Sequence, residues 1–201
     1  MFDRPPPKQT NIEFIMIRFS QIFVSAICAV LLASACSTAK PESSAAEYKP
    51  AATMSDSITG YWTVPDPDTN KTDAIVIGYQ KDGVFYYRMV AVYDDSGKLT
   101  DTAANCTQKA KGIKGNPKMC SFDMIWGLKF DGKKYSGGHI IDPDSGKVYN
   151  CEVWYDAAKQ SLVVRGELWI FGENMNWYKA ENIPNGAKVN PANLTPFTFE
   201  K

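Results

Sequence analysis

Residues that could do chemistry are concentrated in one short segment, GGHIIDPDSGKVYNC, which spans residues 137–151. It holds the chain's only histidine, His139, together with Asp142, Asp144 and Cys151. A thiol beside an imidazole is the nucleophile–base pair of a cysteine hydrolase. Two carboxylates on either side of a cleft are the pair of a glycoside hydrolase. The same run, with its proline and glycine, also has the composition of a tight turn between two strands.

The turn is the interpretation that the sequence favours. Nothing around Asp142 and Asp144 raises a carboxyl pKa, and His139 lacks the partners of a hydrolytic triad or a zinc site. The chain has no G-x-S-x-G motif and no phosphate-binding glycine loop. Counting back from the turn brings His139 and Cys151 close on adjacent strands, so a thiol hydrolase stays as the least favoured hypothesis. We therefore predict no enzyme, no metal and no cofactor.

Composition places the chain among ordinary globular proteins. It has 201 residues, of which 44% are hydrophobic, and its formal net charge at pH 7 is zero. This allows one domain with one core. Without a basic excess, nothing indicates a nucleic-acid partner.

Residues 1–35 have the features of a lipoprotein-type signal peptide. An apolar run over residues 22–32 follows Arg18 and is shorter than the ~20 residues that span a membrane. Ala33-Ser34-Ala35-Cys36 resembles a lipobox, so we expect an acyl chain on Cys36 and a location on the periplasmic face of the outer membrane. Two alternatives stay open, namely ordinary cleavage that yields a soluble periplasmic or secreted protein, and a retained anchor. The first translated residue is either Met1 or Met16.

The rest of the chain divides into three parts. Residues 36–57 are small, polar and proline-marked, which predicts a flexible tether of roughly 25 Å. Residues 58–180 form the folded domain, and residues 181–201 a C-terminal tail. Within the domain, β-rich runs separated by Gly and Asp turns predict strands over 58–64, 73–80, 83–94, 124–130, 134–141, 147–155, 161–170 and 174–180. About eight such strands in series predict an all-β fold, a small antiparallel up-and-down barrel.

Two features of this domain go beyond the strand pattern. The strand over residues 83–94 is apolar on both faces, which indicates an inner core and a covered outer patch. The segment 95–122 is a long irregular insertion with Cys106 and Cys120 near its ends. In an oxidising compartment we expect these two to form a disulfide, contributing ~3 kcal/mol by the chain-entropy model, and Cys151 to be a small buried hydrophobe.

Several motifs resemble an uncharacterised bacterial family, domain of unknown function 2147. They are Ile58-Thr59-Gly60-Tyr61-Trp62, the run GGHIIDPDSGKVY at 137–149, Val164-Arg165-Gly166 and Trp177-Tyr178-Lys179. The resemblance covers roughly residues 58–180 and implies an exported protein with a lipocalin-like barrel and no established activity. Gly60-x-Trp62 is also similar to the lipocalin signature, in which the tryptophan closes the barrel floor beneath a basic residue. Arg165 is the stronger candidate for that base, ahead of Lys179, because a guanidinium plane stacks better than an ammonium.

The export signal, the barrel and the surplus of aromatic residues together favour a binding protein. We expect a small apolar or amphipathic ligand, with Tyr87, Trp126, His139, Tyr149 and Arg165 as candidate contacts. The alternative is a structural or interaction protein of the cell envelope that uses its outer aromatic patch and residues 181–201. The oligomeric state is left open.

Overall fold

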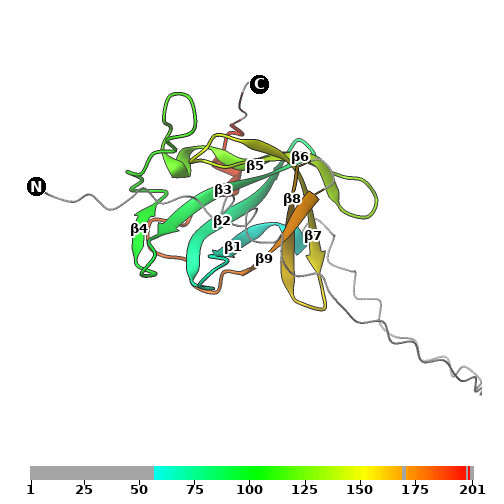
Figure 1. Ribbon diagram of the computed structural model, residues 1–201, viewed down its shortest axis with the longest axis horizontal. Helices are drawn as coiled ribbons and strands as arrows, with labels where there is room; N and C mark the ends of the chain where they lie inside the picture. The colour runs from blue at the N-terminus through cyan, green and yellow to red at the C-terminus, as the bar shows by residue number, and fades with distance from the viewer. Residues whose placement is uncertain (1–56, 169–170, 198, 200–201) are drawn as a thin grey trace, which may run out of the picture.

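The computed structural model describes residues 57–168, 171–197 and 199 (Figure 1). The predicted signal peptide and all of the predicted tether except residue 57 lie outside this range. Within the described residues, no helix is both long and apolar enough to cross a membrane.

The domain is a closed antiparallel barrel. Each barrel strand pairs with the next one in the chain, with β3 pairing with β5, and the β1–β9 pairing closes the ring of eight strands. The short β4 adds to the edge of β3 and is not part of the ring. This confirms the predicted all-β up-and-down barrel, in which closure removes the exposed edges of the sheet. The strands are β1 (Gly60–Pro65), β2 (Thr72–Lys81), β3 (Val84–Tyr93), β4 (Leu99–Thr102), β5 (Asp123–Phe130), β6 (Tyr135–Ile141), β7 (Val148–Asp156), β8 (Ser161–Leu168) and β9 (Phe171–Lys179).

Tight turns explain why the strands follow one another so directly. Asp82 and Gly83 between β2 and β3 both have positive φ, at 50° and 77°, which is the requirement of a type I′ hairpin. The turn between β6 and β7 is held by Asp142, which is buried and accepts hydrogen bonds from the Asp144 amide at 2.9 Å and the Ser145 hydroxyl at 2.6 Å. Residues 142–146 are therefore a hairpin turn, and the Asp142 carboxylate is used in holding it.

We call the end where β1 begins and β9 ends the lower end of the barrel. Its interior is tightly filled, because a Cβ on Gly78 would lie 2.6 Å from the Tyr87 ring and one on Gly138 would lie 2.6 Å from Leu128. Aromatic rings meet across this region, with Phe85 and Tyr135 at 4.6 Å between ring centroids. This part of the barrel is a packed core, as expected when eight strands leave room only for side chains.

The insertion packs over the upper end and is more ordered than predicted. It contains β4 and a 3-10 helix, η2 (Met119–Ser121), and it contributes five buried residues to the main core: Cys106, Ala110, Ile113, Cys120 and Phe122. Its Gly112 amide donates to the Pro143 carbonyl at 3.0 Å, which ties the insertion to the β6–β7 turn. Most of the segment is irregular, as expected, but its apolar residues are buried and complete the core.

Within the insertion, Asp101 organises the loop. Its carboxylate accepts from the amides of Gln108 and Thr107 at 2.6 and 2.9 Å and from the Thr107 hydroxyl at 2.8 Å. Burial alone would raise the pKa of Asp101, but these hydrogen bonds outweigh it and lower the pKa below its usual value.

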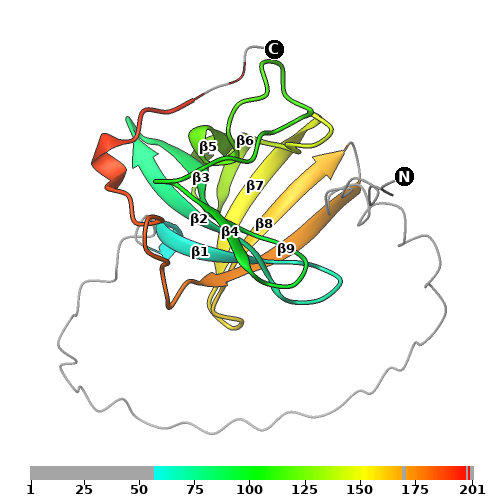
Figure 2. The same ribbon diagram turned by 90° about the vertical axis from the view of Figure 1, so that its left-hand side faces the viewer.

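The predicted C-terminal tail is a strap on the outer wall. Figure 2 shows this red segment, which includes the 3-10 helix η3 (Pro191–Asn193), running along the outside of β1, β2 and β3. It covers a second apolar cluster formed by Ile75, Ile77, Val90, Ala91 and Ala187, with Tyr61, Ile183, Val189 and Leu194 packed around it. The outer patch expected from the two-sided apolar strand exists, and the chain's own strap covers it.

Asp123 fastens the strap to the barrel. Its fully buried carboxylate accepts from Tyr79 Oη, from Arg88 Nε and Nη2, each at 3.0 Å, and from the Phe197 amide at 2.7 Å. Arg88 Nη2 also donates to the Thr195 carbonyl at 2.7 Å. One carboxylate therefore links β2, β3, β5 and the strap.

We predict that Asp123→Asn lowers the free energy of unfolding by about 3–5 kcal/mol, because it leaves the largely buried Arg88 guanidinium without its counter-charge. Urea denaturation measures this, with the exposed Asp68→Asn as the matched control. Equal midpoints for the two variants would contradict the central role of Asp123.

Candidate functional site

The floor of the barrel is built around Trp62. Its ring is fully buried, its Nε1 donates to the Ile58 carbonyl at 3.1 Å, and Lys179 Nζ lies 4.1 Å from the ring centroid. Lys179 Nζ also donates to the Thr59 carbonyl at 2.7 Å. The predicted structural role of Trp62 fits this geometry, with Gly60, at φ 90°, two residues before it on β1.

The choice of Arg165 as the base over Trp62 was wrong. Trp62 lies directly opposite Lys179 in the β1–β9 register, so both face the interior. Arg165 lies opposite Glu152 and Asn174 on the outer face of β7, β8 and β9. Neighbouring residues of a strand point to opposite faces, so Arg165, which follows the inward-facing Val164, points outward.

The barrel wall is weakest between β1 and β9. These strands pair at only two positions, Trp62 with Lys179 and Thr63 with Tyr178, whereas β8 and β9 pair at eight. Above Tyr178, β9 has no strand partner on its β1 side within the described part of the chain. We call this unpaired interval the seam.

Two inward-facing side chains of β9 beside the seam are less buried than inward-facing side chains elsewhere in the barrel. Inward-facing Val76, Val153 and Val164 are fully buried elsewhere in the barrel. In contrast, inward-facing Met175 and Glu173 on β9 are only half-buried. Their inward direction follows from the register, because Met175 lies opposite Val164, and Glu173 opposite Gly166, which itself lies opposite the buried Cys151.

Two polar groups in this interior lack partners. Trp177 Nε1 is buried without a hydrogen-bond acceptor anywhere in the described residues. The Glu173 carboxylate makes no hydrogen bond or ion pair within that same part of the chain, and partial burial raises its pKa. An unsatisfied buried N–H costs about 1–3 kcal/mol, so an acceptor from a ligand or water would stabilise the folded state.

The interior of the barrel is not equally crowded at every glycine. A Cβ on Gly166 would meet its nearest neighbour, Ile140 Cγ2, at 3.7 Å, which is an ordinary contact. Gly78, and Gly138 in the same cross-strand row as Gly166, allow no such addition. The interior beside Gly166 is therefore the less crowded part, and the side chains that share its face are mainly apolar: Ile140, Tyr149, Cys151, Glu173 and Met175.

The five predicted ligand contacts are not brought together. Tyr87 and Tyr149 face the interior, where Tyr87 Oη donates to the Ile58 carbonyl at 3.0 Å. Trp126 and His139 are a cross-strand pair on the outer face and stack at 5.6 Å between centroids, with Phe199 of the strap 5.4 Å from Trp126. Arg165 lies on another part of the outer face. The prediction that Trp126, His139 and Arg165 line an internal pocket was wrong.

The thiol–imidazole pair is also separated. Cys151 lies opposite Gly138 and faces the interior, whereas His139 lies opposite Asn150 and faces outward. Burial raises the pKa of Cys151 far above its usual value, which removes the thiolate that a nucleophile needs. The barrel wall therefore separates the two groups of the predicted pair.

Cys106 and Cys120 lie side by side as free thiols, with the Cys120 amide donating to Cys106 Sγ at 3.2 Å. The predicted disulfide is not formed in the structure, and its formation in an oxidising compartment stays a prediction. Across residues 57–168, 171–197 and 199, no cluster of three or more His, Cys, Asp or Glu residues could hold a metal ion.

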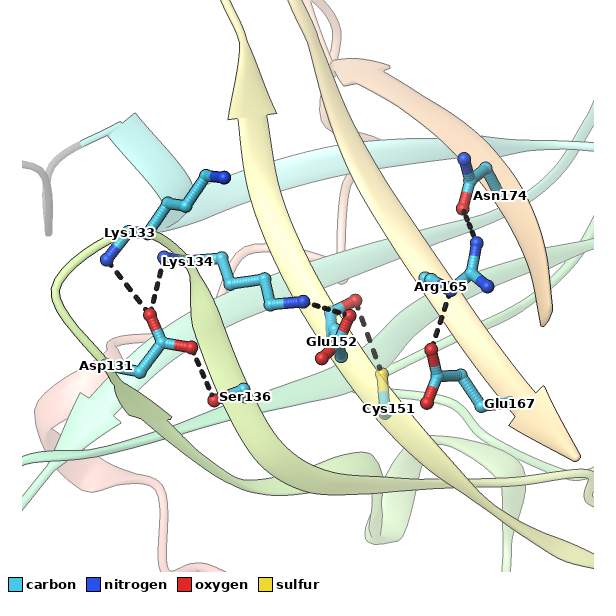
Figure 3. Close-up of polar contacts among 9 residues, drawn as sticks. All are labelled: Asp131, Lys133, Lys134, Ser136, Cys151, Glu152, Arg165, Glu167 and Asn174. Carbon is cyan, nitrogen blue, oxygen red and sulfur yellow. Dashed lines mark hydrogen bonds and ion pairs between the residues drawn. The ribbon is translucent and has the colours of Figure 1, made fainter. Parts of the chain in front are cut away.

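A polar groove of about 820 Å³ follows the outer face of β7, β8 and β9 (Figure 3). Lys134 Nζ contacts Glu152 Oε2 at 2.6 Å, and Arg165 binds Glu167 through Nε at 2.7 Å and Asn174 through Nη1 at 3.2 Å. Sequence reasoning missed this groove. Its only signal in the sequence was that polar or aromatic residues stand two apart on each strand, as in Glu152-x-Trp154 and Arg165-x-Glu167. The register of β7 and β8 was needed to show that these residues share one face.

The fold is that of a small lipocalin-like barrel, as its strand order and register establish. The chain belongs to the family described as "Uncharacterized protein conserved in bacteria (DUF2147)", whose model matches residues 60–179. Among curated proteins none matches. One similar solved structure is a Helicobacter pylori protein described as belonging to the lipocalin family, at 18% identity and a TM-score of 0.49, covering 62% of this chain and 84% of that one.

We predict that Lys179→Ala lowers the free energy of unfolding by about 1–2 kcal/mol, because it removes the cation over Trp62 and the bond to Thr59. Arg165→Ala, which removes only partly exposed contacts, should cost less than about 0.5 kcal/mol. Urea denaturation compares the two. A larger loss for Arg165→Ala would reverse the assignment of the floor cation.

Proposed function

We propose that the protein binds a small amphipathic molecule in the upper half of the barrel. The apolar part of the ligand lies against Ile140, Cys151 and Met175, and its polar end meets Glu173 at the seam. The observation that carries this proposal is that inward-facing Glu173 and Met175 are only half-buried, whereas the inward-facing valines of the barrel are fully buried. A protein interior that admits solvent beside apolar walls is the usual setting of a ligand site.

The unpaired polar groups support the same proposal. Trp177 Nε1 is a donor without an acceptor, and Glu173 is a carboxylate in a partly desolvated position. A ligand with a donor or cation at its polar end satisfies Glu173, and a water satisfies Trp177 Nε1, which lies beside Tyr87 in the packed part of the barrel. Because the lower barrel is already packed with aromatic side chains, the ligand is small and does not reach the floor.

The proposal includes export and attachment to a membrane. The apolar run, the lipobox-like Ala33-Ser34-Ala35-Cys36 and the tether-like composition that follows support an acylated protein on the periplasmic face of the outer membrane. An acyl chain at Cys36 supplies the anchor, and residues 37–57 hold the barrel near a source of amphipathic molecules.

Cys36→Ser should abolish acylation and move the protein from the membrane fraction to the soluble fraction. Labelled palmitate incorporation and cell fractionation measure this, and Cys28→Ser, within the apolar run, should keep the label. An unlabelled wild-type protein that is cleaved after Ala35 would contradict the acyl anchor.

Native mass spectrometry of the protein, purified without detergent, tests the binding proposal. The wild type should retain a dissociable added mass, because the upper interior is occupied by a ligand. Gly166→Leu should lose it, since the new side chain projects into that space, while Gly166→Ala, which fits at ordinary contact distance, should keep it.

Arg165→Leu, on the same strand but facing outward, is the control for a general effect on β8. Retention of the same mass by Gly166→Leu would place the ligand elsewhere. A clean apo mass for the wild type, unchanged after incubation with a lipid extract, would overturn the proposal.

A further inference from the structure

The outer groove is a second concave surface, separated from the barrel interior by the wall itself. Glu152, Arg165 and Asn174 form one cross-strand row on its floor, and all three face outward. The strap covers the wall formed by β1, β2 and β3, so it leaves this face uncovered. The groove is lined by Ser57, Ile58, Lys133, Lys134, Tyr135, Glu152, Trp154, Tyr155, Arg165, Glu167 and Asn174.

The acceptors of the groove are held in fixed positions. Glu152 is bound by Lys134, and Glu167 and Asn174 are both bound by Arg165, at distances of 2.6–3.2 Å. Charge-assisted bonds of this kind orient a carboxylate while leaving lone pairs free to accept from a further donor. The row therefore presents several oriented acceptors to a ligand that carries hydroxyl groups.

The groove also has unmatched positive charge. Its three basic residues, Lys133, Lys134 and Arg165, outnumber its two acidic residues, Glu152 and Glu167, which leaves a surplus of 3 − 2 = +1. The Lys133 ammonium has no hydrogen-bond or ion-pair partner among the described residues, and Figure 3 shows it without a contact of its own. Arg165 uses its Nε and one Nη1 hydrogen and keeps its remaining N–H donors. These groups match an anion.

Trp154 supplies an aromatic surface beside these charges. It lies two residues after Glu152 on the same outer face of β7 and is half-buried in the groove. No ring contact joins it to another aromatic residue within the described part of the chain. An available indole face packs well against a flat apolar surface, such as the C–H face of a pyranose ring.

We infer that this groove binds an oligosaccharide that carries carboxylates. A sugar ring packs on Trp154, and hydroxyl groups donate to Glu152, Glu167 and Asn174. The carboxylates meet Lys133 on one side of the Lys134–Glu152 pair and the free N–H groups of Arg165 on the other side (Figure 3). An acidic peptide fits less well, because it has no pyranose face to pack on Trp154 and no hydroxyl groups to donate to the fixed glutamates. A neutral saccharide leaves the surplus charge unmatched.

Isothermal titration of the purified full-length protein with trigalacturonic acid tests this inference. Maltotriose serves as the neutral saccharide and triglutamate as the acidic peptide. We expect trigalacturonic acid to bind and each comparison ligand to bind at least about fivefold more weakly. Trp154→Ala and Lys133→Gln should each weaken binding of the acidic saccharide about fivefold or more, whereas Lys129→Gln, an exposed lysine outside the groove, should not.

Lys133→Gln changes an unpaired surface group and keeps the test valid if Trp154→Ala fails to fold. Gly166→Leu should leave saccharide binding unchanged, so failure of the internal site and failure of the groove are distinguishable. The inference is overturned if trigalacturonic acid does not bind at about 10 mM, if triglutamate binds equally well, or if both groove variants bind as the wild type does.

Discussion

Closure of the barrel depends on a short contact between its first and last strands. β1 and β9 pair at two positions, and at one of them Trp62 lies opposite Lys179. The hydrogen bonds from Trp62 to Ile58 and from Lys179 to Thr59 fix the chain that enters β1. Eight strands enclose a space that side chains can fill, and the aromatic residues of the lower end fill it. Because β1 and β9 part above this contact, the same closure that seals the floor leaves the seam where Glu173 and Met175 meet solvent.

The outer surface follows from how the remaining apolar residues are covered. β2 and β3 are apolar on both faces, and an exposed patch of that size would promote association. The C-terminal strap covers it, held by the Asp123 carboxylate and by Tyr61, which accepts from and donates to the backbone of Val189 at 2.8 and 2.9 Å. With that wall covered by the chain itself, the outer face of β7, β8 and β9 is left as the concave surface available for a ligand.

Much of the fold could be predicted because its signals are local. β-rich runs between Asp/Gly turns place all eight barrel strands, and the composition of Asp142-Pro143-Asp144-Ser145-Gly146 predicts the turn that the structure contains. Gly60-x-Trp62 predicts a buried tryptophan at one end of the barrel. Such features need only the neighbouring residues in the chain, so a single sequence reveals them.

The site depends on register, which a single sequence does not fix. Arg165 and Lys179 are both basic residues on late strands, yet only Lys179 has the inward parity opposite Trp62. Trp126 precedes a glycine at φ 80°, near register shifts in the β3–β5 pairing, and it faces outward. Cys151 lies opposite Gly138, the residue before His139, so Cys151 and His139 point to opposite sides of the barrel wall. A shift of one residue reverses every side chain, so contacts between strands required the structure.

The central claim is that solvent and a small ligand reach the upper interior through the seam. The most direct measurement is the rate at which a water-soluble thiol reagent modifies Met175→Cys in the folded protein, with Val164→Cys, its fully buried cross-strand neighbour, as the reference. Peptide mass spectrometry locates the label, so the native cysteines do not interfere. The account predicts rapid modification of Met175→Cys, slowed by an amphipathic ligand, and almost none of Val164→Cys. Equally slow modification at both positions would contradict it, because the interior would then be closed.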